Sequence, residues 1–223
     1  MKKDLTEIIF ILDRSGSMGS LEDDTIGGYN AFLDSQRQET GEAQVTTVLF
    51  DDQYELLHNG VDIKQIRPIT RKEYFARGTT ALLDAIGKTI NDVGTRLNNT
   101  DENERPQKVI MVITTDGMEN ASREFSYKQI SEMITHQQEK YSWEFLFLGA
   151  NIDAAKEAEL LGISAKQSAN YVASAIGTQA LFGAVAQGIS SYRDTGRIDA
   201  DWSKELKERK TGKGVELCRI EYN

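Results

Sequence analysis

Three short polar segments of the sequence carry oxygen-bearing side chains that could hold a metal ion. They are Asp13-Arg14-Ser15-Gly16-Ser17, Arg77-Gly78-Thr79-Thr80 and Thr114-Thr115-Asp116-Gly117. Carboxylate and hydroxyl oxygens are hard ligands, and Mg²⁺ takes six of them at about 2.0–2.1 Å while it readily keeps some waters. A zinc site built from His and Cys is disfavoured, because the chain has only two histidines and one cysteine.

Each segment alone has a simpler interpretation. The first could be an Asx turn that caps the following helix, Thr79-Thr80 could be a helix N-cap, and Asp116-Gly117 could be a turn. The metal hypothesis depends on all three segments meeting at one edge of the fold. The elements that carry them therefore decide between the two interpretations.

Strands and helices alternate along the chain. Continuous apolar runs predict buried parallel strands at 7–12, 108–114 and 143–148, and helical periodicity predicts helices at about 21–38, 81–97, 127–140, 152–161 and 174–193. Gln44–Phe50 and Tyr54–Val61 are joined by a short turn and predict an antiparallel hairpin, and a weak strand is expected at 169–173.

This alternation predicts one doubly wound α/β domain over residues 1–195, with a mostly parallel central sheet, one antiparallel edge strand and helices on both faces. Residues 196–223 are predicted to be a charged tail, in which 215–222 either adds a short terminal strand or stays free. Ligands bind beyond the carboxyl ends of parallel strands, so the three polar segments are expected to meet there.

The set of a D-x-S-x-S segment, a Gly-Thr pair and a T-D-G segment after a buried strand resembles the von Willebrand factor type A (vWA) domain, stand-alone bacterial type, and its metal-ion-dependent adhesion site (MIDAS). The resemblance covers about residues 5 to 195. It implies a Rossmann-like fold and a Mg²⁺ or Mn²⁺ site. The ligand positions that it implies are Asp13, Ser15, Ser17, Thr79 and Asp116, with Thr80 as a rival for the place of Thr79.

Serine and threonine contribute dipoles but no charge, so an ion held by such a set stays under-neutralised. An Asp or Glu of a partner protein could then complete the octahedron, which predicts an intracellular, non-enzymatic, metal-dependent protein interaction module. The resemblance implies that the partner could be an ATPase or an assembly factor, since related stand-alone domains often act beside such proteins.

Two other functions remain open from the sequence. The first is a Mg²⁺-dependent phosphatase or phosphotransferase with Asp13 as the nucleophile. Ser15 stands where such an enzyme would want a second carboxylate, and Lys108 is about 26 Å of strand away from Asp116. The second is a metal site that only stabilises the fold.

Other polar residues near the three segments are given smaller roles. Asp51 and Asp52 are predicted to serve the hairpin turn rather than the ion. Glu119 and Asn120 could shape the choice of partner or belong to a solvated loop. Both alternatives stay open at this point.

Composition limits the remaining function classes. The chain has 26 Lys and Arg against 35 Asp and Glu, a net charge of −9, which disfavours nucleic acid as a partner. No run of about 18 apolar residues predicts a membrane span, and the chain starts Met1-Lys2-Lys3-Asp4 without a cleavage signal. A cytoplasmic location without membrane contact is therefore expected.

Overall fold

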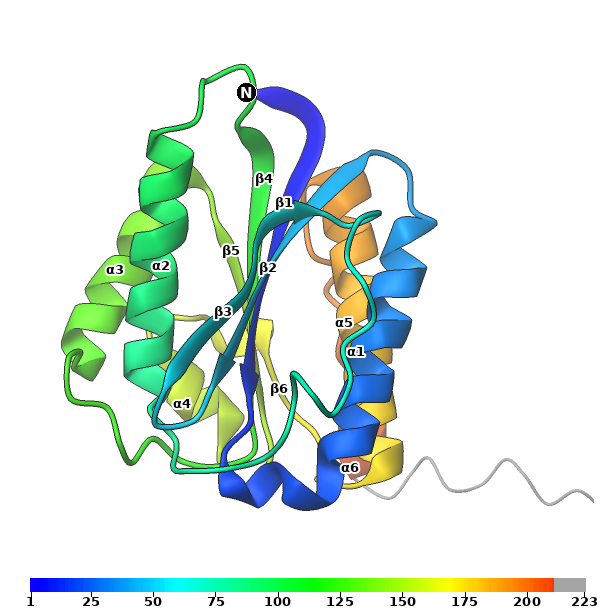
Figure 1. The fold of residues 1–223 in the computed structure, drawn as a ribbon, viewed down its shortest axis with the longest axis vertical. Helices are drawn as coiled ribbons and strands as arrows, with labels where there is room; N and C mark the ends of the chain where they lie inside the picture. The colour runs from blue at the N-terminus through cyan, green and yellow to red at the C-terminus, as the bar shows by residue number, and fades with distance from the viewer. Residues whose placement is uncertain (211–223) are drawn as a thin grey trace, which may run out of the picture.

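The structure is a computed structural model that describes residues 1–210, and a six-stranded sheet forms its centre (Figure 1). The strands follow the order β3-β2-β1-β4-β5-β6 across the sheet, and all are parallel except β3 at one edge. Their bounds are β1 Lys2–Asp13, β2 Glu42–Phe50, β3 Tyr54–Asp62, β4 Pro106–Thr115, β5 Glu144–Gly149 and β6 Ser168–Asn170.

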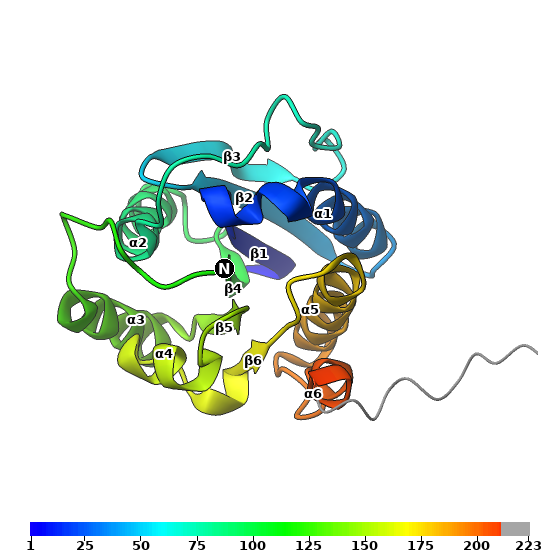
Figure 2. The ribbon, with the colours of Figure 1, turned by 90° about the horizontal axis from the view of Figure 1, so that it is seen from below.

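Helices cover both faces of this sheet (Figure 2). One face carries α1 Glu22–Arg37, α5 Ala175–Thr195 and α6 Lys204–Lys210, and the other carries α2 Leu82–Asn98, α3 Tyr127–Tyr141 and α4 Ala154–Leu160. Two short 3₁₀ helices, η1 Gly16–Leu21 and η2 Ala165–Gln167, complete the described elements. The predicted doubly wound α/β fold with one antiparallel edge strand is confirmed.

The central strand β1 shows why two apolar layers form. Ile8, Phe10 and Leu12 pack into the core beneath α1 and α5, while Ile9 and Ile11 pack into the core beneath α2 and α3. Successive side chains of a strand point to opposite faces, so a continuously apolar strand needs cover on both sides. The apolar run in the sequence therefore positions β1 at the middle of the sheet, with Asp13 at its carboxyl end.

A close helix contact explains one of the glycines of α1. A Cβ on Gly28 would lie 2.2 Å from Cδ2 of Phe182 in α5, so only glycine fits there without movement of the ring. The hairpin of β2 and β3 lies where it was predicted, and α1 and α2 begin within one residue of their expected starts. β6 is confirmed as a strand, although it is shorter than the expected 169–173.

The predicted boundary at residue 195 is corrected by the segment that follows α5. Trp202 is only 2% exposed and belongs to the same core as α5, and its Nε1 donates to the carbonyl of Lys166 at 3.1 Å. Leu206 of α6 is buried in the same core. The domain therefore continues to at least α6, and the expected terminal strand at 215–222 lies outside the described residues.

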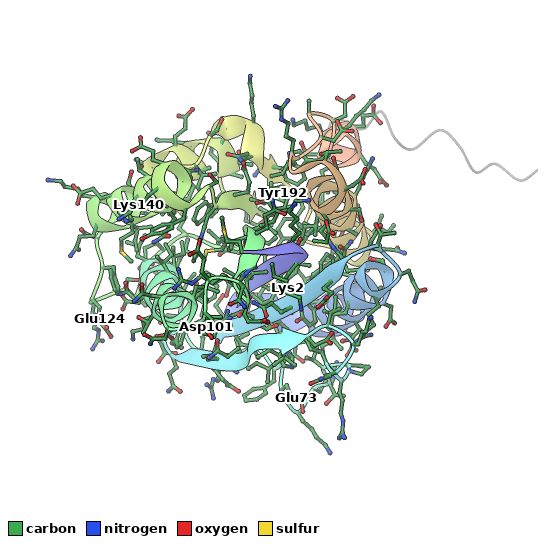
Figure 3. All side chains as sticks on the ribbon, turned by 90° about the horizontal axis from the view of Figure 1, so that it is seen from above. Lys2, Glu73, Asp101, Glu124, Lys140 and Tyr192 are labelled. Carbon is green, nitrogen blue, oxygen red and sulfur yellow. The ribbon has the colours of Figure 1, made fainter. Side chains whose placement is uncertain are left out.

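Figure 3 looks onto the end of the molecule where the parallel strands begin. Lys2 starts β1 there, and Tyr192 near the end of α5 donates its hydroxyl to the carbonyl of Val109 at 3.2 Å. Within residues 1–210, no helix combines the length and apolar character that a membrane span requires.

Candidate metal centre

The predicted site lies at the carboxyl edge of the sheet, between its two central strands. β1 and β4 pair with each other, and Asp13 ends β1 while Asp116 directly follows β4. The chain leaves β1 toward α1 on one face and leaves β4 toward α3 on the other (Figure 2). The loops therefore diverge here and leave the crevice in which open α/β sheets bind ligands.

The loop after β1 turns sharply, and this turn gathers its polar groups. The backbone N–H of Ser15 donates to Oδ1 of Asp13 at 2.7 Å, and the N–H of Met18 donates to the carbonyl of Ser15 at 2.9 Å. The N–H of Gly16 reaches the carbonyl of Gly78 at 3.2 Å. The D-x-S-x-S segment is thus an Asx turn that leads into η1, and it is also tied to the second predicted segment.

A chain of hydroxyl groups connects the first segment to the third. Ser15 Oγ lies 3.1 Å from Ser17 Oγ, and Ser17 Oγ donates to Oδ1 of Asp116 at 2.5 Å. Each hydroxyl has one proton and two lone pairs. Because Asp116 accepts the proton of Ser17, Ser15 donates to Ser17, and one lone pair of the Ser17 oxygen remains available to a cation.

The structure places Thr80, and not the preferred Thr79, with this cluster. The point that a Cβ on Gly117 would occupy lies 3.8 Å from Oγ1 of Thr80 and 3.9 Å from Oγ of Ser17, so both hydroxyls face the same small space. Thr80 is 3% exposed. Thr79 is exposed and lines a neighbouring cavity of about 290 Å³. Thr80, the rival of Thr79 in the sequence, therefore lies beside the cluster, and its role as a ligand stays a prediction.

The backbone before α2 explains why the two threonines face different surroundings. Gly78 has a φ of +66°, and a Cβ there would lie 2.0 Å from Oδ1 of Asp52. This turn directs the next two side chains in different directions, one to the cavity and one to the cluster. Adjacency to the glycine carried no information about which threonine faces the site.

Three polar contacts at the site were not predicted from the sequence. Thr115 donates its hydroxyl to Oδ2 of Asp13 at 2.6 Å, so both oxygens of this carboxylate accept hydrogen bonds. Tyr74 donates to the carbonyl of Asp13 at 2.6 Å, and the side-chain amide of Asn151 donates to the carbonyl of Asp116 at 3.2 Å. Asn151 follows the carboxyl end of β5, so the rule that identified the other segments could have found it.

Glu119 and Asn120 fasten the loop after β4 to the start of α2. The side chain of Asn120 accepts from the N–H of Thr80 at 3.0 Å, and its own N–H donates to the carbonyl of Thr80 at 3.0 Å. Glu119 accepts from the N–H groups of Leu83 and Ser122 at 3.0 and 2.7 Å. Asn120 is thus a structural partner of Thr80, and Glu119 fastens its own loop to the first turn of α2.

Burial raises the pKa of Asp13 above its ordinary value, and the charge of Asp116 adds to this increase. Burial also raises the pKa of Asp116, while the hydrogen bond from Ser17 acts in the opposite direction. Two carboxylates that share a buried site favour a cation between them, because a cation stabilises their charged forms.

The arginine inside the first segment does not supply this charge. Arg14 is fully buried, and its guanidinium donates to Oδ2 of Asp51 at 3.2 Å and to Oε2 of Glu55 at 2.7 Å. Asp51 also accepts from the N–H of Gln53 at 2.6 Å. Asp51 thus serves the hairpin turn, as predicted, and an ion pair that the sequence did not indicate.

The donor chemistry fits a hard divalent cation. Asp13, Ser15, Thr80 and Asp116 are each no more than 4% exposed, whereas Ser17 is exposed. The oxygens therefore form a cup that opens to solvent on the side of Ser17. In residues 1–210, no group of three or more His, Cys, Asp or Glu residues could hold a metal ion, and this cup offers hydroxyl oxygens beside its two carboxylates.

The sequence matches no protein-family model and no curated protein. The structure does resemble solved structures. Proximal thread matrix protein 1 from the mussel byssus, with a zinc-occupied MIDAS motif, is 18% identical with a TM-score of 0.56, and the match covers 81% of this chain and 44% of that chain. Manganese-loaded TRAP protein from Plasmodium vivax is 18% identical with a TM-score of 0.55, and the match covers 76% of this chain and 69% of that chain.

A third similar structure is von Willebrand factor type A from Catenulispora acidiphila, which is 14% identical with a TM-score of 0.55. The match covers 83% of this chain and 42% of that chain, so the chain spans less than half of the length of this protein and of the mussel protein. Together with the strand order and the single antiparallel edge strand, these likenesses show that the chain has the von Willebrand factor type A fold.

Proposed function

We propose that this domain is a divalent-metal-dependent protein interaction module that binds an acidic side chain of its partner through Mg²⁺ or Mn²⁺. Asp13, Ser15, Ser17, Thr80 and Asp116 would hold the ion. The observation that carries the proposal is the hydrogen-bonded chain from Ser15 through Ser17 to Asp116, which joins two loops 99 residues apart at one open cup.

The chemistry of the cup supports a role in binding a carboxylate. Three of its five side chains are neutral hydroxyls, and the two carboxylates also share their charge with hydrogen-bond donors, so a bound divalent cation keeps part of its positive charge. The exposed Ser17 marks the side from which a ligand can approach. A carboxylate that enters there would complete the octahedron with a strong charge-assisted contact. The metal-loaded neighbours support this proposal by analogy.

The alternative of a phosphatase or phosphotransferase has less support. Both oxygens of Asp13 accept hydrogen bonds, from Ser15 and Thr115, and these bonds stabilise the carboxylate and so lower its reactivity as a nucleophile. Lys108 lies near the opposite end of β4, where it donates to the carbonyl of Arg193. It is therefore not placed to neutralise a phosphate at Asp13. A partner that is an ATPase or assembly factor and a cytoplasmic location stay predictions from the sequence.

Metal binding is tested by thermal unfolding with Mg²⁺, with Mn²⁺ and with chelator. A cation that binds only the folded state raises the melting temperature, and Asp13→Ala and Ser15→Ala are expected to abolish the rise. Ser20→Ala is the matched control, because Ser20 is exposed in the same loop and is not one of the proposed ligands. An unchanged melting temperature in the wild-type chain, or an equal effect of Ser20→Ala, would refute the metal site.

Carboxylate recognition is tested with immobilised metal-loaded protein and short peptides that contain either Asp or Asn at one position. Binding of the Asp peptides in Mg²⁺ and its loss in chelator would support the proposal. A metal that stabilises the protein while no Asp peptide binds would support the alternative of a metal site that only stabilises the fold. Hydrolysis of a phosphoester that Asp13→Asn abolishes would favour the enzyme.

A further inference from the structure

Three exposed apolar side chains lie beside the proposed metal site. Met118, Val172 and Ile176 are 69%, 46% and 65% exposed, and we call them the apolar rim. Met118 follows Asp116 by two residues, and the other two come from the loop between β6 and α5 and from the first turn of α5. Seven large apolar side chains are exposed in residues 1–210, and the three of the apolar rim are among them.

A side-chain hydrogen bond links the segment before Val172 to the end of β4, and Met118 follows β4 closely. Tyr171 is buried, and its hydroxyl lies 3.4 Å from the carbonyl of Thr115, directly before Asp116. A Cβ on Gly177 would lie 1.9 Å from the carbonyl oxygen of Val172, so this loop is pressed against the start of α5. The segments that carry the rim therefore lie near each other at the carboxyl edge of the sheet, and Figure 2 shows the molecule from this end.

The opposite flank of the site is polar. Phe75 is the exposed aromatic residue there, but the guanidinium groups of Arg14 and Arg77 lie 5.6 and 5.2 Å from its ring centroid. The neighbouring cavity of about 290 Å³ has charged side chains in its wall, among them Asp52 and Lys88. An apolar group of a partner would consequently bind on the side of the rim.

We propose that the site recognises an acidic residue with an apolar neighbour in the partner protein, and that the apolar rim binds this neighbour. The inference rests on the proposed function, since the ion would supply the charge that attracts the carboxylate. The occupant is argued from complementarity. A cation beside three neutral hydroxyls and two hydrogen-bonded carboxylates would attract an anion, and three exposed apolar side chains beside it favour an apolar group.

The test uses the full chain in Mg²⁺ and four short peptides, which combine Asp or Asn with a neighbouring Leu or Ser. The peptide with both Asp and Leu is expected to bind most tightly. Replacing Leu by Ser, or changing the protein by Met118→Ser or Ile176→Ser, is expected to weaken its binding by roughly tenfold, because apolar contact area is lost. Leu160→Ser is the matched control, because Leu160 is 49% exposed at the end of α4.

The outcomes separate this inference from the proposed function. Equal binding of Asp peptides with Leu and with Ser would overturn the rim and leave metal-dependent carboxylate binding intact. Failure of every peptide to bind in Mg²⁺ would overturn both. Self-association of the metal-loaded chain that Ile176→Ser abolishes would show that the rim binds a second copy, and would also overturn the inference. An effect of Leu160→Ser as large as that of Ile176→Ser would assign the loss to a general change of the surface.

Discussion

Replacement of Thr80 by valine tests the geometry of the metal site most directly. Valine keeps the shape of threonine but lacks the hydroxyl, so the change removes one proposed ligand without leaving a large cavity. Thr79→Val is the matched comparison, because it makes the same chemical change one residue earlier, where the side chain is exposed and faces the neighbouring cavity. The two variants should behave differently only if Thr80 contacts the ion.

The size of the effect follows from linkage. At a metal concentration about 100 times the dissociation constant, the ion stabilises the folded state by about 2.7 kcal/mol. In a domain of this size, 1 kcal/mol corresponds to about 2–4 °C in melting temperature, so the wild-type rise is about 5–11 °C. Loss of one neutral ligand is expected to lower the affinity roughly tenfold, by about 1.4 kcal/mol, which halves the rise.

Thermal unfolding of each variant with and without Mg²⁺ gives the measurement, and the metal-free value of each variant serves as its own reference. This reference matters because the buried hydroxyl of Thr80 can affect the stability of the metal-free protein as well. A full metal-induced rise in Thr80→Val, or equal reductions in both variants, would refute the assignment of Thr80 as a ligand.

Three further changes test other parts of the structure. Asn120→Ala removes the side-chain contact to the N–H of Thr80 and should weaken metal binding severalfold in a titration, whereas a retained affinity would contradict its positioning role. Trp202→Ala should lower the free energy of unfolding in urea by about 3–5 kcal/mol, and no change would restore the boundary at residue 195. Burial raises the pKa of Glu7, so its stabilising contribution is present below the unfolded pKa and lost as the pH rises through the folded pKa. Urea unfolding of Glu7→Gln should therefore show a free energy that increases relative to wild type from about pH 5 to about pH 8, and a constant difference would contradict this sign.

The architecture could be predicted from the sequence because its signals are local. β1, β4 and β5 each contain a continuous apolar run, and such strands need a helix on each face. The hairpin of β2 and β3 follows from a turn of only three residues. These patterns also place Asp13 and Asp116 at the ends of two strands, and parallel neighbours bring those ends together.

Other features depend on contacts that no local pattern records. Which of Thr79 and Thr80 faces the site depends on the positive φ of Gly78 and on Asn120, which lies 40 residues further along the chain. The packing of Trp202 against α5 was missed, because one aromatic residue in a charged segment gives no periodic signal. Such tertiary contacts override the composition of the segment that contains them.

The hydrogen bonds of the site explain why its carboxylates favour a metal without having to bind it directly. Asp13 accepts from the backbone of Ser15 and from Thr115, and Asp116 accepts from Ser17, so each carboxylate orients a group beside it. The serine oxygens are then already close together, and only the contact between Ser15 and Ser17 must change when an ion enters. Because a preformed site loses little conformational freedom on binding, its affinity for metal depends on this arrangement. In the proposed function, selectivity among partners would come from the residues around the cup, where the apolar rim lies.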